Sequence, residues 1–373
     1  MRASLRRRVR WWAAFGLIGV AGLALTVLLI AWSGVYSVAA SRGHWAVMEW
    51  FLTFGMQNSV EARARFIDPP PLDDPDLVTL GAGHFHGGCA YCHGAPGIPI
   101  SPIAQHMLPM PPDLSEATKH WKETELFWIV KHGIKYTGMP AWPSQQRDDE
   151  IWAVVAFLKQ LPDLDAQGYR RLAVGGLTVA PQSGRELAVT EAAPEATTAC
   201  VRCHGAAGQG PASKLVPVLH GQPREFLLAA LQAFASGKRE SGIMQPVATG
   251  LEQNAMARLA EFYSRLPPPS TSAAEITGIE QGRVLATEGS PDAGIPACVS
   301  CHGADALPAY PRLAGQNAAY MAGRLKRWKD GYVADTPTHK IMAPIAQLLS
   351  EQQIEEVSAY FSAQSATSRA GRP

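Results

Sequence analysis

The chain has 373 residues, of which 47% are hydrophobic, the length and composition of a folded protein of about two to four domains and not of a disordered one. Its net charge is only +1, but residues 1–43 hold six arginines and no acidic residue, so the rest carries 27 basic against 32 acidic side chains. A mildly acidic body lacks the basic stripe that nucleic-acid binding requires, and we expect no nucleic-acid partner.

The first predicted element is a membrane anchor. Trp11 to Trp32 make up 22 consecutive uncharged residues, and a helix of that length crosses the roughly 30 Å hydrocarbon core of a bilayer. Five arginines precede it, so the positive-inside rule keeps the amino terminus in the cytoplasm. We predict that residues 1–33 form a cytoplasmic basic tail and an uncleaved, single-pass anchor in a bacterial inner membrane, with the body in the periplasm. A signal peptide cleaved near residues 37–41 is the alternative, although its apolar region is usually only about 7–15 residues long.

Residues 34–75 are predicted to form a juxtamembrane amphipathic segment and a linker. Residues 44–60 are dense in aromatic side chains, which suits a helix lying on the membrane surface or a contact with an integral membrane partner. Packing of this segment against the first folded domain is a third interpretation, and the sequence does not separate the three. The stretch "DPPPLDDPD" near the end of this region is rich in proline, as linkers often are.

Three copies of a Cys-x-x-Cys-His motif follow, and they contain all six cysteines of the chain. Residues three apart lie on one face of a helix, so two thiols at this spacing can bond the two vinyl groups along one edge of a haem, and the histidine that follows can reach the iron. The motif is the signature of c-type haem attachment. It predicts three covalently attached haem c groups, with thioether links at Cys89, Cys92, Cys200, Cys203, Cys298 and Cys301 and iron ligands at His93, His204 and His302.

Three other roles for the motif are less consistent with the sequence. A redox-active dithiol is typical of a thioredoxin-like βαβ unit, whereas these motifs lie among predicted helices. A zinc site takes four ligands, and each motif supplies three. A structural disulfide would need a cysteine outside the motifs, and there is none.

Each motif heads a repeat of similar design. The second and third motifs are 98 residues apart, and "SGIMQP" and "HKIMAP" keep that distance, which pairs Met244 with Met342. Met139, Met244 and Met342 each lie 18 residues before an aromatic residue of a predicted closing helix. Because all three keep this position in the repeat, we predict these methionines as the second iron ligands, where a thioether raises the reduction potential. A nearby proline is expected to hold each of them in an extended loop, and Met107 and Met110 compete with Met139 in the first repeat.

Apolar residues recur at helical spacing within the repeats, and no segment shows the sustained alternation of a strand. In "DDEIWAVVAFLKQLP", for example, Ile151, Val155 and Leu158 fall on one face of a helix. The predicted fold is therefore all-α, with the N-terminal transmembrane helix followed by three tandem domains. A unit of about 90 residues buries little apolar surface alone, so a porphyrin is expected at the centre of each core. The predicted domains are residues 76–165, 175–268 and 275–366.

From residue 76 to about 365 the chain resembles class I cytochromes c. The second and third repeats together resemble the dihaem cytochrome c-four family, on "CVRCHG", "LHGQP" and "AFASGKRESGIMQPVA" in one and "CVSCHG", "YPRLAGQ" and "RWKDGY" in the other. The first repeat, from "CAYCHGAPG" to "KYTGMPAW", is similar to single-haem domains of the class. The resemblance implies three tandem class I cytochrome c domains. It also implies the ligand pairs His93 with Met139, His204 with Met244 and His302 with Met342.

The function that the resemblance implies is periplasmic electron carriage between a quinol-oxidising complex or dehydrogenase and a terminal oxidase. The leading hypothesis is therefore a membrane-tethered electron-transfer protein, not an enzyme, with no catalytic residues and with redox proteins and the inner membrane as partners. A second hypothesis makes the chain the cytochrome subunit of a membrane-bound alcohol or sugar-acid dehydrogenase. A third, a haem peroxidase or a sulfur-compound oxidoreductase, requires an iron with an open or exchangeable position.

Overall fold

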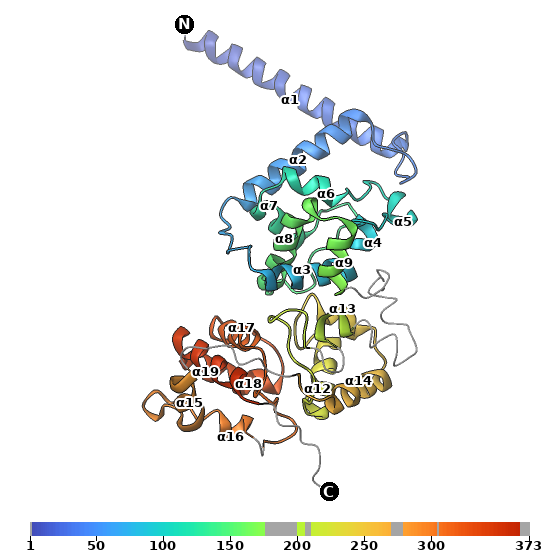
Figure 1. Cartoon of the computed structure of the whole chain (residues 1–373). Coiled ribbons are helices and arrows are strands. Elements are labelled where there is room, and N and C mark those ends of the chain that lie inside the picture. The colour runs from blue at the N-terminus through green and yellow to red at the C-terminus, as the bar shows by residue number, and fades with distance from the viewer. Residues whose placement is uncertain (1, 176–199, 206–209, 270–278, 304–305, 366–373) are drawn as a thin grey trace.

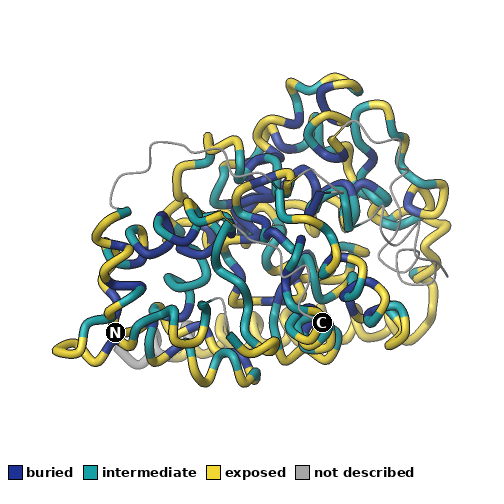
Figure 2. Tube along the Cα trace, turned by 60° about the horizontal axis from the view of Figure 1, so that its bottom comes forward, coloured by how far each residue is buried: buried dark blue, intermediate teal, exposed yellow. Residues whose placement is uncertain are grey.

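The structure is a computed structural model that describes residues 2–175, 200–205, 210–269, 279–303 and 306–365. Within these residues the regular structure is helical, and β pairing is confined to two isolated bridges, Ala95 with Ile98 and Ser290 with Ile295. The predicted all-α fold is confirmed for the described part of the chain. Figure 1 shows a long N-terminal helix and three helical units beyond it, and Figure 2 shows that the buried segments gather inside these units.

The N-terminal helix α1 (Arg2–Ser33) is long and apolar enough to cross a membrane over Arg10–Ser33, and none of its most apolar stretch is buried inside the protein. Length and composition of this kind fit a membrane span or a signal sequence. The helix begins at Arg2, so the basic tail that the sequence predicts is the first part of the same helix.

The next helix, α2 (Ala46–Ala64), has two halves with different surroundings. It packs against α7 (Glu123–His132) of the first unit, and the buried residues Val60 and Ala64 lie in its C-terminal half. In its N-terminal half Trp50 is 64% exposed. Packing on the first folded unit, one of the three interpretations of this segment, therefore applies to the C-terminal half.

Helices of the first unit begin where the sequence supplies caps. Asp74 accepts a hydrogen bond from the backbone N–H of Asp76 (2.9 Å) just before Pro75, the first residue of α3. Asp165 caps α9 through the N–H of Gly168 (2.6 Å). Besides α7, the unit contains α3 (Pro75–Gly88), α4 (Ala90–His93), α5 (Pro102–Gln105), α6 (Leu114–Ala117), α8 (Asp148–Gln160), α9 (Ala166–Val174) and the 3-10 helices η1 (Thr118–His120) and η2 (Leu161–Asp163).

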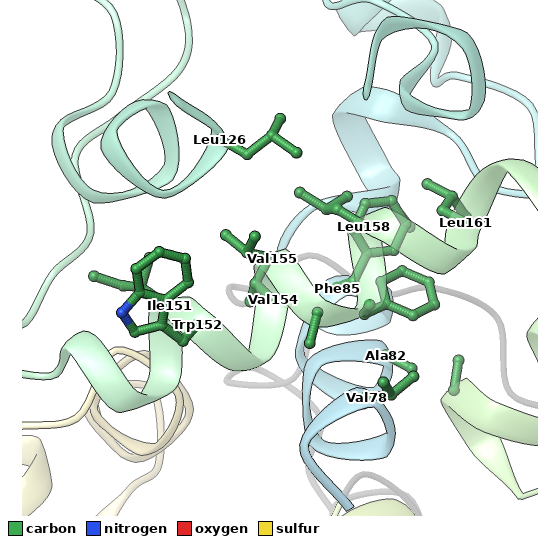
Figure 3. Close-up of a cluster of buried hydrophobic side chains, with 14 of the residues drawn as sticks. Val78, Ala82, Phe85, Leu126, Ile151, Trp152, Val154, Val155, Leu158 and Leu161 are labelled. Atoms are coloured by element: carbon green, nitrogen blue, oxygen red, sulfur yellow. The ribbon is translucent and has the colours of Figure 1, made fainter. Parts of the chain in front are cut away.

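The core of the first unit forms around α8, where side chains from α3, α7 and α8 converge (Figure 3). Ile151, Val155 and Leu158 are buried, as the predicted apolar face requires. Trp152 and Val154 on other sides of the helix are buried too, because α3 and α7 both pack against α8 and its first turn contacts the second unit. The amphipathic helix of the sequence is therefore a central helix of the fold.

The second and third units lie next to one another beyond the first (Figure 1). Residues 176–199, which precede the second motif, lie outside the described residues. The second unit contains α12 (Arg224–Ala235), α13 (Met244–Thr249) and α14 (Gln253–Arg265). The third contains α15 (Ile279–Glu288), η3 (Pro291–Ala293), α16 (Val299–His302), α17 (Ala318–Lys329), α18 (Pro337–Leu348) and α19 (Glu351–Ala363).

The first and third units share a close helix crossing. The helix before the motif crosses the closing helix, as α3 on α8 and as α15 on α19. A Cβ on Gly81 would lie 1.9 Å from the carbonyl oxygen of Ala153, and one on Gly282 would lie 2.0 Å from that of Glu356. Backbone cannot move aside as a flexible side chain can, so each crossing requires glycine.

Candidate functional site

Each Cys-x-x-Cys-His motif forms about one helical turn, as predicted. The backbone N–H of His93 donates to the carbonyl of Cys89 (3.0 Å), and that of His302 donates to Cys298 (2.9 Å). The second motif is helical over residues 200–204. All six cysteines are free, and Cys301 is the exposed one among them. The thiols and the imidazole of each motif are thus presented from one short helical segment.

All three motif histidines make the same hydrogen bond, from ring Nδ1 to a proline carbonyl. The pairs are His93 with Pro112 (2.9 Å), His204 with Pro217 (3.0 Å) and His302 with Pro311 (3.0 Å). A carbonyl can only accept, so Nδ1 carries the hydrogen and Nε2 keeps its lone pair. A bond of this kind fixes the tautomer and the ring orientation of metal-ligating histidines. Each ring is therefore prepared to bind a metal through Nε2.

The sequence interpretation assigned no role to these three prolines. Pro217 and Pro311 begin the aligned segments "PVLHGQP" and "PRLAGQN", 94 residues apart. This alignment could have indicated that the two prolines have the same role. Pro112 lies in "PMPPDL" of the first repeat, which lacks that segment. In the first repeat the contact forms because the fold brings His93 and Pro112, which are 19 residues apart in the sequence, close together.

Burial lowers the pKa of all three motif histidines and raises the pKa of the first cysteine of each motif. It lowers the pKa of His204 to about 4, although the bond to Pro217 acts in the opposite direction, and it lowers the pKa of His302 as well. Neutral imidazole is the form that binds a metal. Burial also raises the pKa of Cys89 and of Cys200 to about 12, whereas cysteines of redox-active dithiols have lowered pKa values. The dithiol alternative is therefore not supported.

The second and third motifs face one continuous cavity of about 1030 Å³. This volume slightly exceeds the roughly 300–1,000 Å³ found for single-ligand pockets, and the mainly apolar wall is of the kind that such ligands need. The predicted site residues in its lining are Cys200, Cys203, His204, Met244, Cys298, His302 and Met342. The structure thus brings together the predicted residues of these two repeats, except the exposed Cys301, in a space that suits porphyrin.

The predicted methionine ligands are all half-buried, but their backbones differ. Met139 lies in the loop after α7, as predicted. Met244 is the first residue of α13 and Met342 lies inside α18, so the expectation of an extended loop is wrong for these two. Pro246 falls in the first turn of α13, where its missing N–H is not needed, and Pro344 is accommodated within α18 with the loss of one backbone hydrogen bond.

The first unit holds the competing methionines. Met107 packs against Gly138, the residue before Met139, and it remains a competitor. Met110 is 54% exposed, which does not suit a ligand on a buried iron.

The zinc alternative finds no support in the described part of the chain. No group of three or more His, Cys, Asp or Glu side chains there is placed to hold a metal ion. The cavity lining adds one methionine to the motif residues of the second and of the third unit, and a histidine with a methionine suits a haem iron better than zinc.

Two matching glutamine contacts join the second and third units. Gln222 donates from Nε2 to the carbonyl of Arg312 (2.8 Å) and accepts at Oε1 from the N–H of the same residue (2.9 Å). Gln316 makes the same two bonds with Val218 (3.0 and 2.8 Å). Gln316 and Arg312 each follow their counterparts by 94 residues, so the two repeats pair in an approximately twofold manner. This pairing brings both motifs to one cavity.

Replacing Gln222 by alanine is expected to lower the free energy of unfolding of the paired units by about 1–3 kcal/mol, because it removes both hydrogen bonds between this side chain and the backbone of Arg312. Chemical denaturation of the full-length protein in detergent measures the change. Gln253→Ala, at an exposed position at the start of α14, is the control and should have little effect. Equal unfolding midpoints for the two variants would contradict the role of the glutamine pair.

Comparison with known proteins places these features in one family. A profile described as "Cytochrome C oxidase, cbb3-type, subunit III" matches residues 76–158, and one described as "Cytochrome c" matches residues 279–365. The thiosulfate dehydrogenase electron acceptor of Thiomonas intermedia is 36% identical over 178 residues, 46% of this chain and 82% of the relative. Cytochrome c4 of Pseudomonas aeruginosa is 33% identical over 165 residues, 43% of this chain and 81% of the relative.

One solved structure is also similar. The crystal structure of reduced cytochrome c4 from Pseudomonas stutzeri matches with a TM-score of 0.41 at 30% identity, over 44% of this chain and 93% of that one. The 178-residue match to the Thiomonas protein is longer than the 98 residues between the second and third motifs. The likeness in sequence therefore extends over more than one repeat.

Proposed function

The chain belongs to the class I c-type cytochromes, and from that premise we propose that it carries electrons in the periplasm through three haem c groups while tethered to the inner membrane. Covalent haem c and electron carriage follow from the family. A bound haem supplies a one-electron redox centre, and the protein supplies its attachment and its ligands. The observation that carries the proposed number of three is the hydrogen bond from each motif histidine to a proline carbonyl, repeated in all three units.

The proposed ligands follow from the same geometry. The free Nε2 of each motif histidine is one ligand, and the methionine of the same repeat is the other. The cavity supports the second and third pairs, because both members of each pair line it. The proposed attachment sites are Cys89 with Cys92, Cys200 with Cys203 and Cys298 with Cys301. The proposed iron ligands are His93 with Met139, His204 with Met244 and His302 with Met342.

The proposed domains keep the predicted bounds of residues 175–268 and 275–366, whereas the first is extended from residues 76–165 to residues 76–174. The reason is α9, which follows residue 165 and packs against α3. Tyr169 of α9 is fully buried, and its hydroxyl lies 2.9 Å from Nδ1 of His86. Residues 166–174 are therefore part of the packed core of the first unit, and a fragment that tests this domain should include them.

We place the amino terminus in the cytoplasm and the haem units in the periplasm, with α1 across the membrane. The N-terminal half of α2 supports a membrane contact, since Trp50, Phe51 and Phe54 are 64%, 60% and 52% exposed only a short loop after α1. Aromatic side chains of this kind favour the interface between lipid and water. This half of α2 would then lie at the membrane surface and hold the first unit close to it.

Protease treatment of intact spheroplasts tests this orientation. We expect the protease to remove the haem-bearing units and to leave a membrane-bound N-terminal fragment, and we expect the full chain to resist extraction with alkaline carbonate. Release by osmotic shock of a haem protein that lacks the N-terminal residues up to about residue 41 would instead show a cleaved signal peptide.

The proposed electron donor is a quinol-oxidising complex or a dehydrogenase, and the proposed acceptor is a terminal oxidase. One relative is named as the electron acceptor of thiosulfate dehydrogenase, which favours a dehydrogenase as donor. The same observation keeps a second candidate function, the cytochrome subunit of a membrane-bound dehydrogenase complex, such as one for alcohols or sugar acids. Stable co-purification with a cofactor-bearing dehydrogenase would favour this second function.

A redox titration of the purified chain, followed through its absorption spectrum, tests the carrier function. We expect three reversible one-electron steps at high potential and a thioether-to-iron band in the oxidised state. High-spin haem, or peroxide consumption without a partner, would contradict the carrier function and would favour a haem peroxidase or a sulfur-compound oxidoreductase.

A further inference from the structure

The first unit meets the second at a buried carboxylate. Glu150, in the first turn of α8, has a side chain that is only 3% exposed. Its Oε1 accepts a hydrogen bond from Ser241 Oγ (2.5 Å), and its Oε2 accepts one from the backbone N–H of Gly242 (2.6 Å), both in the second unit. Arg147 of its own unit forms an ion pair with it (2.8 Å). The charge is therefore balanced, as a buried charge must be.

The segment that Glu150 binds leads directly to Met244. Ser241 Oγ accepts hydrogen bonds from the backbone N–H groups of Ile243 (3.2 Å) and Met244 (3.0 Å). A serine hydroxyl has one hydrogen and two lone pairs, so both lone pairs are in use and the hydrogen goes to Glu150. The carboxylate thereby fixes the hydroxyl that caps the start of α13, and α13 begins with Met244.

Gly242 shows how tightly this segment is held. A Cβ at Gly242 would lie 2.0 Å from Nε1 of Trp142, a buried side chain of the first unit. The same Nε1 donates to Glu150 Oε2 (3.3 Å). The indole and the carboxylate therefore form a clamp around residues 241–242, and this clamp (Trp142 and Glu150) exists only while the first unit is docked.

The third unit is built differently at this point. In the aligned segments "SGIMQP" and "HKIMAP", His339 and Lys340 take the places of Ser241 and Gly242. Lys340 pairs with Asp335 of its own unit (3.2 Å), and both side chains are about 70% exposed. Within the described residues, the segment before Met244 thus contacts a carboxylate of another unit, and the aligned Lys340 before Met342 pairs with a carboxylate of its own unit.

We propose that Glu150 is a positioning residue for the second haem. By holding Ser241 and Gly242 it sets where the Met244 sulfur lies, so that docking of the first unit tunes the redox centre of the second. This inference rests on the proposed ligation of that haem by Met244. Loss of the clamp weakens the thioether ligand, and because a thioether raises the potential, the potential of this one haem falls.

The test uses the full-length holoprotein in detergent and measures the thioether-to-iron band and the three reduction potentials. Met244→Ala is measured first, because the band intensity that it removes is the part of the total intensity that the second haem contributes. Glu150→Ala and Ser241→Ala are each expected to lose most of that share and to lower one potential while the other two stay constant. Ser241→Ala changes no charge, so its effect reports position alone.

Asp149→Ala is the matched control. Asp149 lies at the same junction and pairs with Arg147 (2.8 Å) and with Arg327 of the third unit (2.9 Å). Its side-chain bonds go to these two arginines, and within the part of the chain that the structure describes they do not extend to residues 241–244. We expect this variant to keep the full band and all three potentials. If it loses as much of the band as Glu150→Ala, the effect is one of docking in general and the positioning role is refuted.

Two further outcomes are decisive and can be told apart. If Glu150→Ala and Ser241→Ala keep the wild-type band and potentials while Met244→Ala does not, the inference fails and the ligation stands. If Met244→Ala itself leaves the band unchanged, the proposed ligation by Met244 fails, and the inference fails with it.

Discussion

Replacing Met342 by histidine is expected to lower the reduction potential of the haem proposed for the third unit by a sizeable part of the roughly 0.8 V that axial ligands span, and to leave the other two proposed potentials unchanged. A thioether ligand raises the potential relative to a second histidine. Met342 lines the same cavity as His302 and packs against the cluster that contains Trp328 and Tyr332. A spectroelectrochemical titration of the variant and the wild type measures the shift.

The control distinguishes a ligand from a core methionine. Met256, in α14, is 2% exposed and does not line the cavity. Met256→Leu nearly conserves volume and should leave all three potentials at their wild-type values. If Met342→His also leaves them unchanged, Met342 is a packing residue and the proposed ligand set of the third unit is wrong.

A methyl group at the crossing of α3 and α8 is expected to destabilise the first unit by about 1–3 kcal/mol. In Gly81→Ala the new Cβ would lie 1.9 Å from the carbonyl oxygen of Ala153 and 3.0 Å from the Cβ of Phe157. Both neighbours belong to the buried central helix, so relief requires the two helices to separate. Denaturant unfolding of the detergent-solubilised chain, followed by haem absorbance, measures the loss.

Gly55→Ala makes the same chemical change where there is room. Gly55 lies inside α2, and a Cβ there would meet nothing within 4 Å. Alanine favours a helix by up to about 1 kcal/mol over glycine, so this variant should be neutral or slightly more stable. Equal stability of the Gly81 and Gly55 variants would show that the crossing in solution is looser than the structure has it.

The local backbone of the Cys-x-x-Cys-His motifs could be predicted from the sequence. The Cys-x-x-Cys-His spacing encodes one helical turn by itself, so it needs no knowledge of the fold, and the structure forms that turn at Cys89 and at Cys298. The all-α class follows in the same way from helical periodicity. The closing helix of the first unit was expected to have one buried face. It is instead buried all round, because the contacts of α3, α7 and the second unit with it are all long-range.

The contacts between residues far apart in the chain could not be predicted from local sequence patterns. The bonds of the motif histidines to proline carbonyls span up to 19 residues, and the bond of Glu150 to Ser241 spans 91. No spacing rule points to such pairs, since only the folded chain brings them together. The backbone at Met342 was predicted as an extended loop because Pro344 follows closely. Proline disfavours a helix without forbidding one, and α18 continues through it.

The mass of the mature chain tests the central claim most directly. Thioether links survive denaturation, so intact-protein mass spectrometry in denaturing solvent counts the covalent haems. We predict the mass of the polypeptide plus three haem groups, and a shift to two haems in a Cys200→Ala, Cys203→Ala double variant. A mass equal to the bare polypeptide, or to one or two haems in the wild type, would contradict the account.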